Sequence, residues 1–83
     1  GYTILHYVIN NYPKINNADQ LIDKILNNPN VQSFINIQDS VNNNTPLHLA
    51  TAYGNNEVAQ KLITKGADKT ILNNKKEFVG TDN

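Results

Sequence analysis

The sequence predicts a small all-α domain in which helix-turn-helix units stack as a solenoid, with hairpin-like loops between them. The chain has 83 residues, which allows one domain. Its apolar residues recur at helical spacing in the stretches 21–26 and 58–63. The tetrapeptide TILH at 3–6 returns as TPLH at 45–48. A signal that recurs in this way is typical of a repeat protein.

The composition narrows the classes of function. The formal net charge is zero, which argues against nucleic-acid or membrane-surface binding, because both depend on a basic surplus. The chain has no cysteine, so it has neither disulfides nor thiolate sites. Its apolar runs are too short to span a bilayer. We therefore expect no nucleic-acid partner and no membrane insertion. An intracellular location, cytoplasmic or nuclear, is a separate expectation that these features do not establish.

The first unit begins at Thr3, whose hydroxyl can cap a short helix. Tyr12-Pro13 is expected to end that helix, because proline disfavours helical geometry in the residue before it. Asn17 is then expected to cap a second helix over residues 18–26. The core of this unit is predicted to include Tyr7.

The second unit repeats these features with stronger signals. Thr45 is suited to cap its first helix, and Pro46 at the first helical position gives up no needed hydrogen bond. Gly54 predicts a turn with positive φ. Either Asn55 or Asn56 is expected to cap the helix that follows.

The pattern resembles the ankyrin repeat family. The positions that carry the resemblance are Thr3, His6, Thr45, Pro46, Leu47, His48, Gly54 and Gly66. Thr3 and Thr45 are 42 residues apart, against about 33 in the family, and the extra residues fall in asparagine-rich loops. Asn43 stands where the family usually has glycine, and Gly66 is placed to end the second helix.

The resemblance implies one repeat over about 1–36, a second over about 37–70, and a partial third unit or cap over 71–83. Ankyrin arrays need about three units to bury a continuous core, so we expect this chain to be a segment of a longer array.

His6 and His48 are the obvious candidates for chemistry. On one interpretation they form a metal pair or supply a general base. On the other, each imidazole bonds the threonine of its own unit and nearby backbone, which the matched spacing favours. No third ligand and no acid–base pair can be nominated from the scattered carboxylates, and Asp39 and Asp68 are expected to serve turns. We therefore expect no catalytic residue, metal, cofactor or small-molecule substrate.

The resemblance also implies where a partner protein binds, because ankyrin arrays bind proteins through hairpin tips and the concave face of the short helices. By position, the tip candidates are Tyr2, Val41, Asn42 and Asn44. The inner-face candidates are Asn10, Asn11, Ala52 and Tyr53, with Lys65 at the rim. Tyr2 and Tyr53 are the best anchors, since aromatic residues dominate interface energetics. The alternative for Tyr53 is packing against the neighbouring hairpin.

The resulting hypothesis is a non-enzymatic protein–protein interaction module. A narrower version is an inhibitor-of-NF-κB-like domain that binds a transcription factor, since elongated units of this kind occur in that group. Two alternatives stay open. One is the substrate-recruiting arm of a larger enzyme or of a host-interacting effector, and the other is a spacer whose tips bind nothing.

Overall fold

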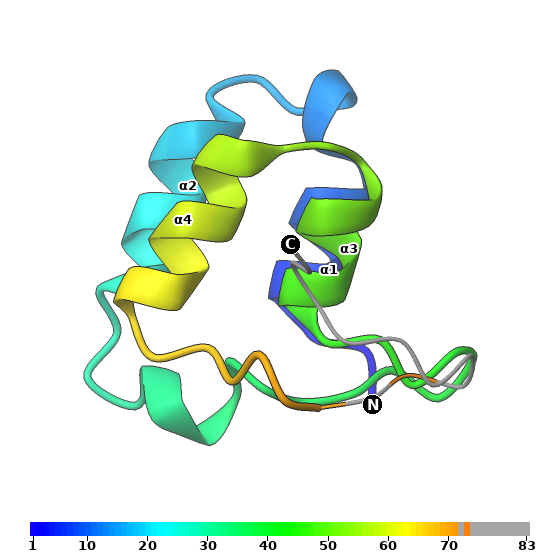
Figure 1. Cartoon of the computed structure of the whole chain (residues 1–83). Coiled ribbons are helices and arrows are strands. Elements are labelled where there is room, and N and C mark those ends of the chain that lie inside the picture. Colours follow the sequence, from blue (N-terminus) through cyan, green and yellow to red (C-terminus); the bar gives the residue numbers. More distant parts are fainter. Residues whose placement is uncertain (72, 74–83) are drawn as a thin grey trace.

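The computed structural model describes residues 1–71 and 73, and its four α-helices form two pairs (Figure 1). The first pair is α1 (Ile4–Asn10) and α2 (Ala18–Leu26), and the second is α3 (Pro46–Ala52) and α4 (Asn56–Thr64). Short 3₁₀ helices at Tyr12–Lys14 and Val31–Ser33 lie in the loops. The described residues contain no strand, and the all-α expectation is confirmed.

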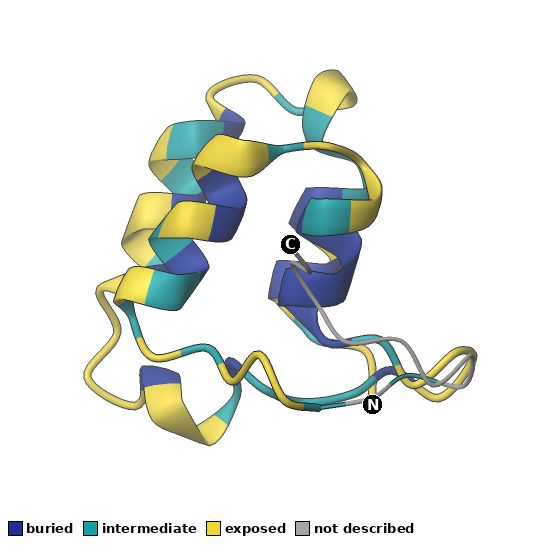
Figure 2. Ribbon diagram, in the orientation of Figure 1, coloured by how far each residue is buried: buried dark blue, intermediate teal, exposed yellow. Residues whose placement is uncertain are grey.

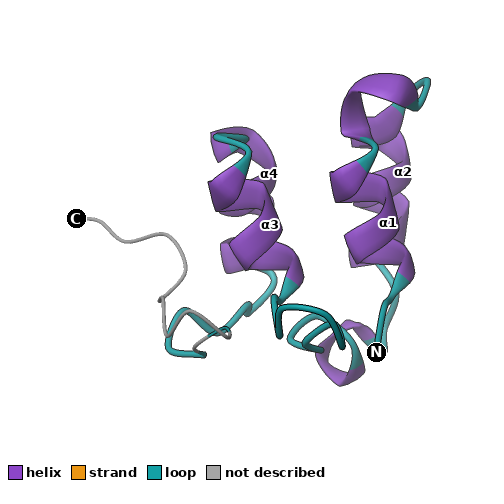
Figure 3. Ribbon diagram, turned by 90° about the vertical axis from the view of Figure 1, so that its right-hand side faces the viewer, coloured by secondary structure: helices purple, strands orange, loops and turns teal. Residues whose placement is uncertain are grey.

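The two pairs stand side by side, with α3 next to α1 and α4 next to α2 (Figures 1 and 3). We call α1 and α3 the inner helices and α2 and α4 the outer helices. Residues 74–83, which hold most of the predicted third unit, lie outside the described residues. None of the helices in the described part is long and apolar enough to cross a membrane.

Each inner helix begins with a capping box, as its threonine predicts. The Oγ1 atom of Thr3 accepts from the His6 N–H at 3.4 Å, and the His6 Nδ1 atom accepts from the Thr3 N–H at 3.0 Å. Thr45 and His48 repeat this exchange at 3.2 and 2.9 Å. Two N–H groups are thereby satisfied at each helix start.

The outer helices begin in different ways. The Asn55 side chain accepts from the Val58 N–H at 3.3 Å, so it caps α4 as one of the two expected alternatives. Asn17 precedes α2 but its side chain makes no cap hydrogen bond, and that prediction is wrong. The reason is its left-handed backbone, with φ of 60°, whereas a capping residue needs an extended backbone. Asn17 serves the turn instead.

The loops turn where the sequence places glycine, asparagine and aspartate. Gly54 and Gly66 have φ of 70° and 99°, and Asn43 has φ of 56°. These three left-handed residues confirm the expected turns. The Oδ1 atom of Asp68 accepts from the N–H and the hydroxyl of Thr70 at 2.8 and 2.6 Å, so Asp68 serves a turn as expected.

The core lies between the inner and outer helices, whose buried sides face one another (Figure 2). Its largest fully buried apolar side chains are Leu5, Ile9, Ile22, Ile35, Leu47 and Leu62. Tyr7 is 52% exposed, so its assignment to the core is wrong. Leu5, Val8 and Ile9 follow the three- and four-residue spacing of one helix face, and Tyr7 lies between them on another face.

Helix α1 ends at Asn10, with Asn11 between it and Tyr12-Pro13, which agrees with the expected end of this helix. Asn11 takes the position after the helix, where its Nδ2 atom donates to the Tyr7 carbonyl at 2.9 Å. The Tyr7 carbonyl also accepts from the Asn11 backbone N–H at 3.1 Å, so Asn11 holds the end of α1 by two hydrogen bonds. The proline lies in the 3₁₀ turn that follows.

Candidate functional site

The two imidazoles hold the inner helices in place. His6 and His48 are 0% and 5% exposed, and each Nδ1 atom lies 2.9 Å from the hydroxyl oxygen of its own unit's threonine. Because the Thr3 N–H donates to Nδ1 of His6, the other ring nitrogen carries the proton. That Nε2 atom donates to the Asn44 carbonyl at 2.8 Å. His6 therefore joins the first unit to the hairpin of the second.

This arrangement confirms the structural interpretation of the histidine pair, since each ring bonds its own threonine and backbone. Among residues 1–71 and 73, no three His, Cys, Asp or Glu side chains are grouped so that they could hold a metal ion.

Two other titratable groups are held in their protonated forms at neutral pH. A hydrogen bond to Asp19 is the main cause that raises the pKa of Tyr12, and burial adds to it. The hydrogen bond to Asp23 raises the pKa of Lys61. Neither pKa is lowered toward neutral pH, so neither side chain is prepared to act as a general base.

Asp39 organises the hairpin tip. This residue is 7% exposed, and its Oδ1 atom accepts from the backbone N–H groups of Val41, Asn42 and Asn44 at 3.2, 2.8 and 3.3 Å. Burial alone would raise the pKa of Asp39, but these N–H groups and the nearby His6 lower it on balance. The Asp39 N–H also donates to the Asn44 carbonyl at 2.8 Å, which closes the tip.

The predicted tip residues are not equally accessible. Val41 is 75% exposed and Asn42 is exposed as well. Asn44 is half-buried, and its carbonyl is taken by His6 and by the Asp39 N–H. The Asn44 Oδ1 atom accepts from Asn73 at 2.9 Å. Val41 and Asn42 are therefore the accessible residues of the tip, whereas Asn44 mainly holds the tip in place through its hydrogen bonds.

Three of the predicted contact residues are linked by hydrogen bonds. The Tyr53 hydroxyl donates to Asn10 Oδ1 at 2.7 Å, and Asn10 Nδ2 donates to the Tyr2 hydroxyl at 3.0 Å. We call Tyr2, Asn10 and Tyr53 the tyrosine bridge. Its tyrosines are 55% and 60% exposed, and the Tyr2 ring stacks on His6 with the centroids 5.5 Å apart. The bridge crosses from one unit to the other, which the sequence did not indicate.

The chain segments that carry the bridge and the exposed part of the tip have no charged side chains. Residues 1–13 and 40–56 contain no Lys, Arg, Asp or Glu, and they include both inner helices and the tip. Ala52 is exposed within this stretch, whereas Asn11 is half-buried and engaged at the end of α1. The inner surface is therefore aromatic and amide-rich.

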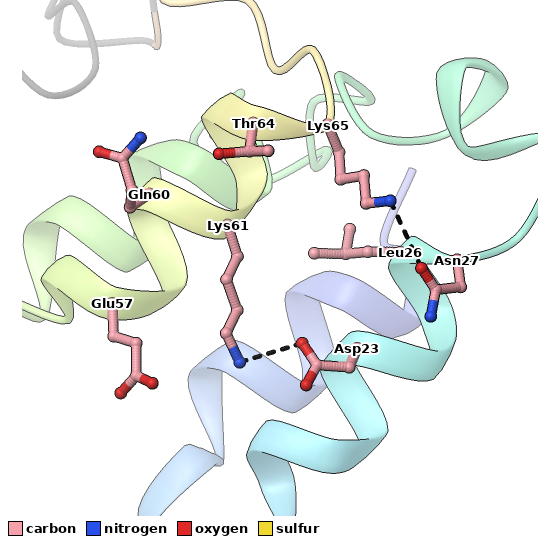
Figure 4. A pocket seen from close by; sticks show the side chains of 8 residues that line it. All are labelled: Asp23, Leu26, Asn27, Glu57, Gln60, Lys61, Thr64 and Lys65. Atoms are coloured by element: carbon pink, nitrogen blue, oxygen red, sulfur yellow. Dashed lines mark hydrogen bonds and ion pairs between the residues drawn. The ribbon is translucent and has the colours of Figure 1, made fainter.

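Lys65 lies apart from the tyrosine bridge, in a groove of about 600 Å³ between α2 and α4 (Figure 4). Its Nζ atom is 3.4 Å from Asn27 Oδ1. The groove is crossed by the ion pair of Lys61 and Asp23, whose charged atoms are 3.0 Å apart. The groove is lined by Asp23, Leu26, Asn27, Glu57, Gln60, Lys61, Thr64 and Lys65. It was not predicted, because its two walls come from helices far apart in the sequence.

A family model described as ankyrin repeats (3 copies) matches residues 1–73. The match includes both helix pairs and both capping boxes. No match was found among curated proteins or among solved structures.

Proposed function

The chain belongs to the ankyrin repeat family, and we propose that it is a non-enzymatic module that binds a partner protein through the tyrosine bridge and the hairpin tip. Ankyrin repeats are generally protein–protein interaction modules, and the family is typically non-enzymatic. The bridge and the tip correspond by position to the concave face and the hairpin tips that the family uses.

The observation that carries the proposal is the hydrogen-bonded connection from Tyr53 through Asn10 to Tyr2. Exposed aromatic side chains are the commonest anchors of protein interfaces. Ordering a side chain on binding costs about 0.5–1.5 kcal/mol, and part of this cost is removed where hydrogen bonds already hold the rings. Tyrosine and asparagine are also the residues that antibody paratopes favour.

The proposal is tested on the affinity of a partner isolated with the wild-type chain. Tyr53→Ala should weaken binding by about tenfold or more, since a hot-spot residue contributes about 2 kcal/mol. Asn44→Ala should also weaken it, because the Asn44 side chain helps to frame the tip. The matched control is Gln20→Ala, an exposed amide on outer helix α2. The assigned face is wrong if both test variants keep the wild-type affinity and the wild-type circular dichroism.

The finer versions of this function stay predictions. The inhibitor-of-NF-κB-like version rests on residues common to ankyrin repeats in general. The recruiting arm of an enzyme or effector, and the intracellular location, depend on sequence beyond these 83 residues. A catalytic motif in the flanking sequence would favour the recruiting arm over the free-standing module.

A further inference from the structure

The tyrosine bridge has a direction, which its two hydrogen bonds define. The Tyr53 hydroxyl donates to Asn10 Oδ1 at 2.7 Å, and Asn10 Nδ2 donates to the Tyr2 hydroxyl oxygen at 3.0 Å. The hydrogen of the Tyr2 hydroxyl therefore needs a different acceptor. Among residues 1–71 and 73, neither that hydrogen nor the second hydrogen of the Asn10 amide has one. The bridge thus offers two donors to a ligand.

The rings beside these donors are open to solvent, since Tyr2 and Tyr53 are 55% and 60% exposed. The Tyr2 ring is stacked on His6 with an angle of 24° between the ring planes. Together with the hydrogen bond from Asn10, this stacking restricts the orientation of the Tyr2 ring. The site therefore combines two exposed, hydrogen-bonded rings with donors that a ligand can reach.

The chain segments that carry the bridge favour an uncharged ligand. Residues 1–13 and 40–56 include both inner helices and the exposed part of the tip, and they contain no Lys, Arg, Asp or Glu. A charged group buried against these segments would lose its water without gaining an opposite charge from them. We therefore expect the ligand to contact the bridge through uncharged residues.

A proline-rich segment fits this surface better than an ordinary extended peptide. An ordinary peptide brings one N–H group for every carbonyl, and each N–H that is buried without an acceptor is unfavourable. Proline brings a carbonyl and no N–H, which suits a surface with donors to offer. Its ring packs on exposed aromatic rings, and a polyproline II helix is already ordered before it binds. Pairing with a sheet edge needs a strand, and the described residues contain none.

We propose that the tyrosine bridge binds an uncharged, proline-rich segment of its partner protein in the polyproline II conformation. The prolines pack on the rings of Tyr2 and Tyr53. Backbone carbonyls of the segment accept from the Tyr2 hydroxyl and the Asn10 amide. This inference rests on the proposed partner-binding face and adds the chemistry of the partner.

The test measures, by NMR titration, how the 83-residue chain binds synthetic peptides with blocked ends. The probe is an oligoproline of about ten residues, and the control is a flexible, uncharged glycine–serine peptide of the same length. We expect the oligoproline to bind more tightly and to shift the signals of Tyr2, Asn10 and Tyr53. Its affinity should not fall between about 0.1 M and about 1 M salt, because salt screens only charges.

Tyr2→Phe removes the outward donor and keeps the ring. It should weaken oligoproline binding by about two- to tenfold, which corresponds to one hydrogen bond. The matched control is Tyr7→Phe, because Tyr7 is 52% exposed on α1 and lies outside the bridge. It should leave the affinity unchanged, and both variants should keep the wild-type circular dichroism.

Three results would overturn the proposal. The first is oligoproline binding no tighter than that of the glycine–serine peptide. The second is an affinity that neither Tyr2→Phe nor Tyr53→Ala lowers, since the oligoproline then occupies another surface. The third is tighter binding of a proline–glutamate peptide that salt weakens, since the ligand is then charged.

The proposed face and the proposed ligand can fail separately. Suppose that Tyr53→Ala weakens binding of the isolated partner, but oligoproline neither binds the chain nor competes with that partner. The face is then correct, and the proline-rich ligand is wrong. Competition between oligoproline and the partner, lost together with partner binding in Tyr53→Ala, supports both.

Discussion

Replacing Asp39 tests how the hairpin tip is held. A hydrogen bond to a charged group contributes about 1.5–3 kcal/mol, and Asp39 accepts three, from Val41, Asn42 and Asn44. Val41 and Asn42 are exposed, so water can hydrogen-bond their N–H groups when the carboxylate is removed and offset part of the lost free energy. We therefore expect Asp39→Ala to lower the free energy of unfolding by about 2–3 kcal/mol, and Asp39→Asn, which keeps an acceptor oxygen, by about 1 kcal/mol.

The pH dependence separates the charge from the shape of this side chain. Burial opposes ionisation of Asp39, but its N–H donors and His6 hold its pKa below the ordinary 3.8. A group whose pKa is lowered in the folded state stabilises the fold above its unfolded pKa, and this stabilisation is lost as the pH falls through its folded pKa. The difference between wild type and Asp39→Asn should therefore be constant near neutrality and shrink below about pH 4.

The assay is urea unfolding followed by far-UV circular dichroism, at pH values from neutral to about 3. Ser40→Ala, at an exposed neighbouring residue, is the control and should change the stability by less than about 0.5 kcal/mol. If the difference between wild type and Asp39→Asn is as large at about pH 3 as at neutrality, the ionised carboxylate is not what holds the tip.

Two other substitutions probe the turns and the contact between units. Gly66→Ala should lower the free energy of unfolding by about 1–3 kcal/mol, because its φ is 99° and a Cβ there would lie 2.7 Å from Gln32 Nε2. Gly54→Ala, where a Cβ meets open space, should lower the free energy of unfolding by less in the same urea titration. Equal losses of stability in the two variants would show that the contact with Gln32 does not matter. His6→Ala should cost about 2–4 kcal/mol, because it removes a buried cap and the bond to Asn44. A loss of stability in α1 alone, measured by hydrogen exchange, would argue against the bond between units.

The features that the sequence predicted correctly depend on residues close together in the chain. A capping box needs only Thr3 and His6, three positions apart. A left-handed turn at Gly66 likewise depends mainly on the residue itself. The same spacing recurs at Thr45 and His48, so the sequence predicted the starts of both inner helices.

The features that were missed depend on distant contacts. Asn17 fits a cap by residue type, but its backbone is left-handed, with φ of 60°, which the residue type alone does not determine. Lys65 was placed at the rim of the concave face, yet it lies in the groove beside Asn27. The tyrosine bridge joins Asn10 to Tyr53, which are 43 positions apart. A hydrogen bond between residues so far apart in the chain cannot be predicted from a local sequence pattern.

Tyr7 and Tyr53 show why exposure alone does not identify a binding residue. They are 52% and 60% exposed, although Tyr7 lies within α1 and Tyr53 directly follows α3. Tyr53 has the first unit beside it and uses its hydroxyl to bond Asn10. Tyr7 stands at the position where Leu49 is covered in the second unit. Comparing equivalent positions of the two units therefore separates the two tyrosines: Tyr53 stays the proposed anchor for a partner, whereas Tyr7 occupies a position that is covered in the second unit.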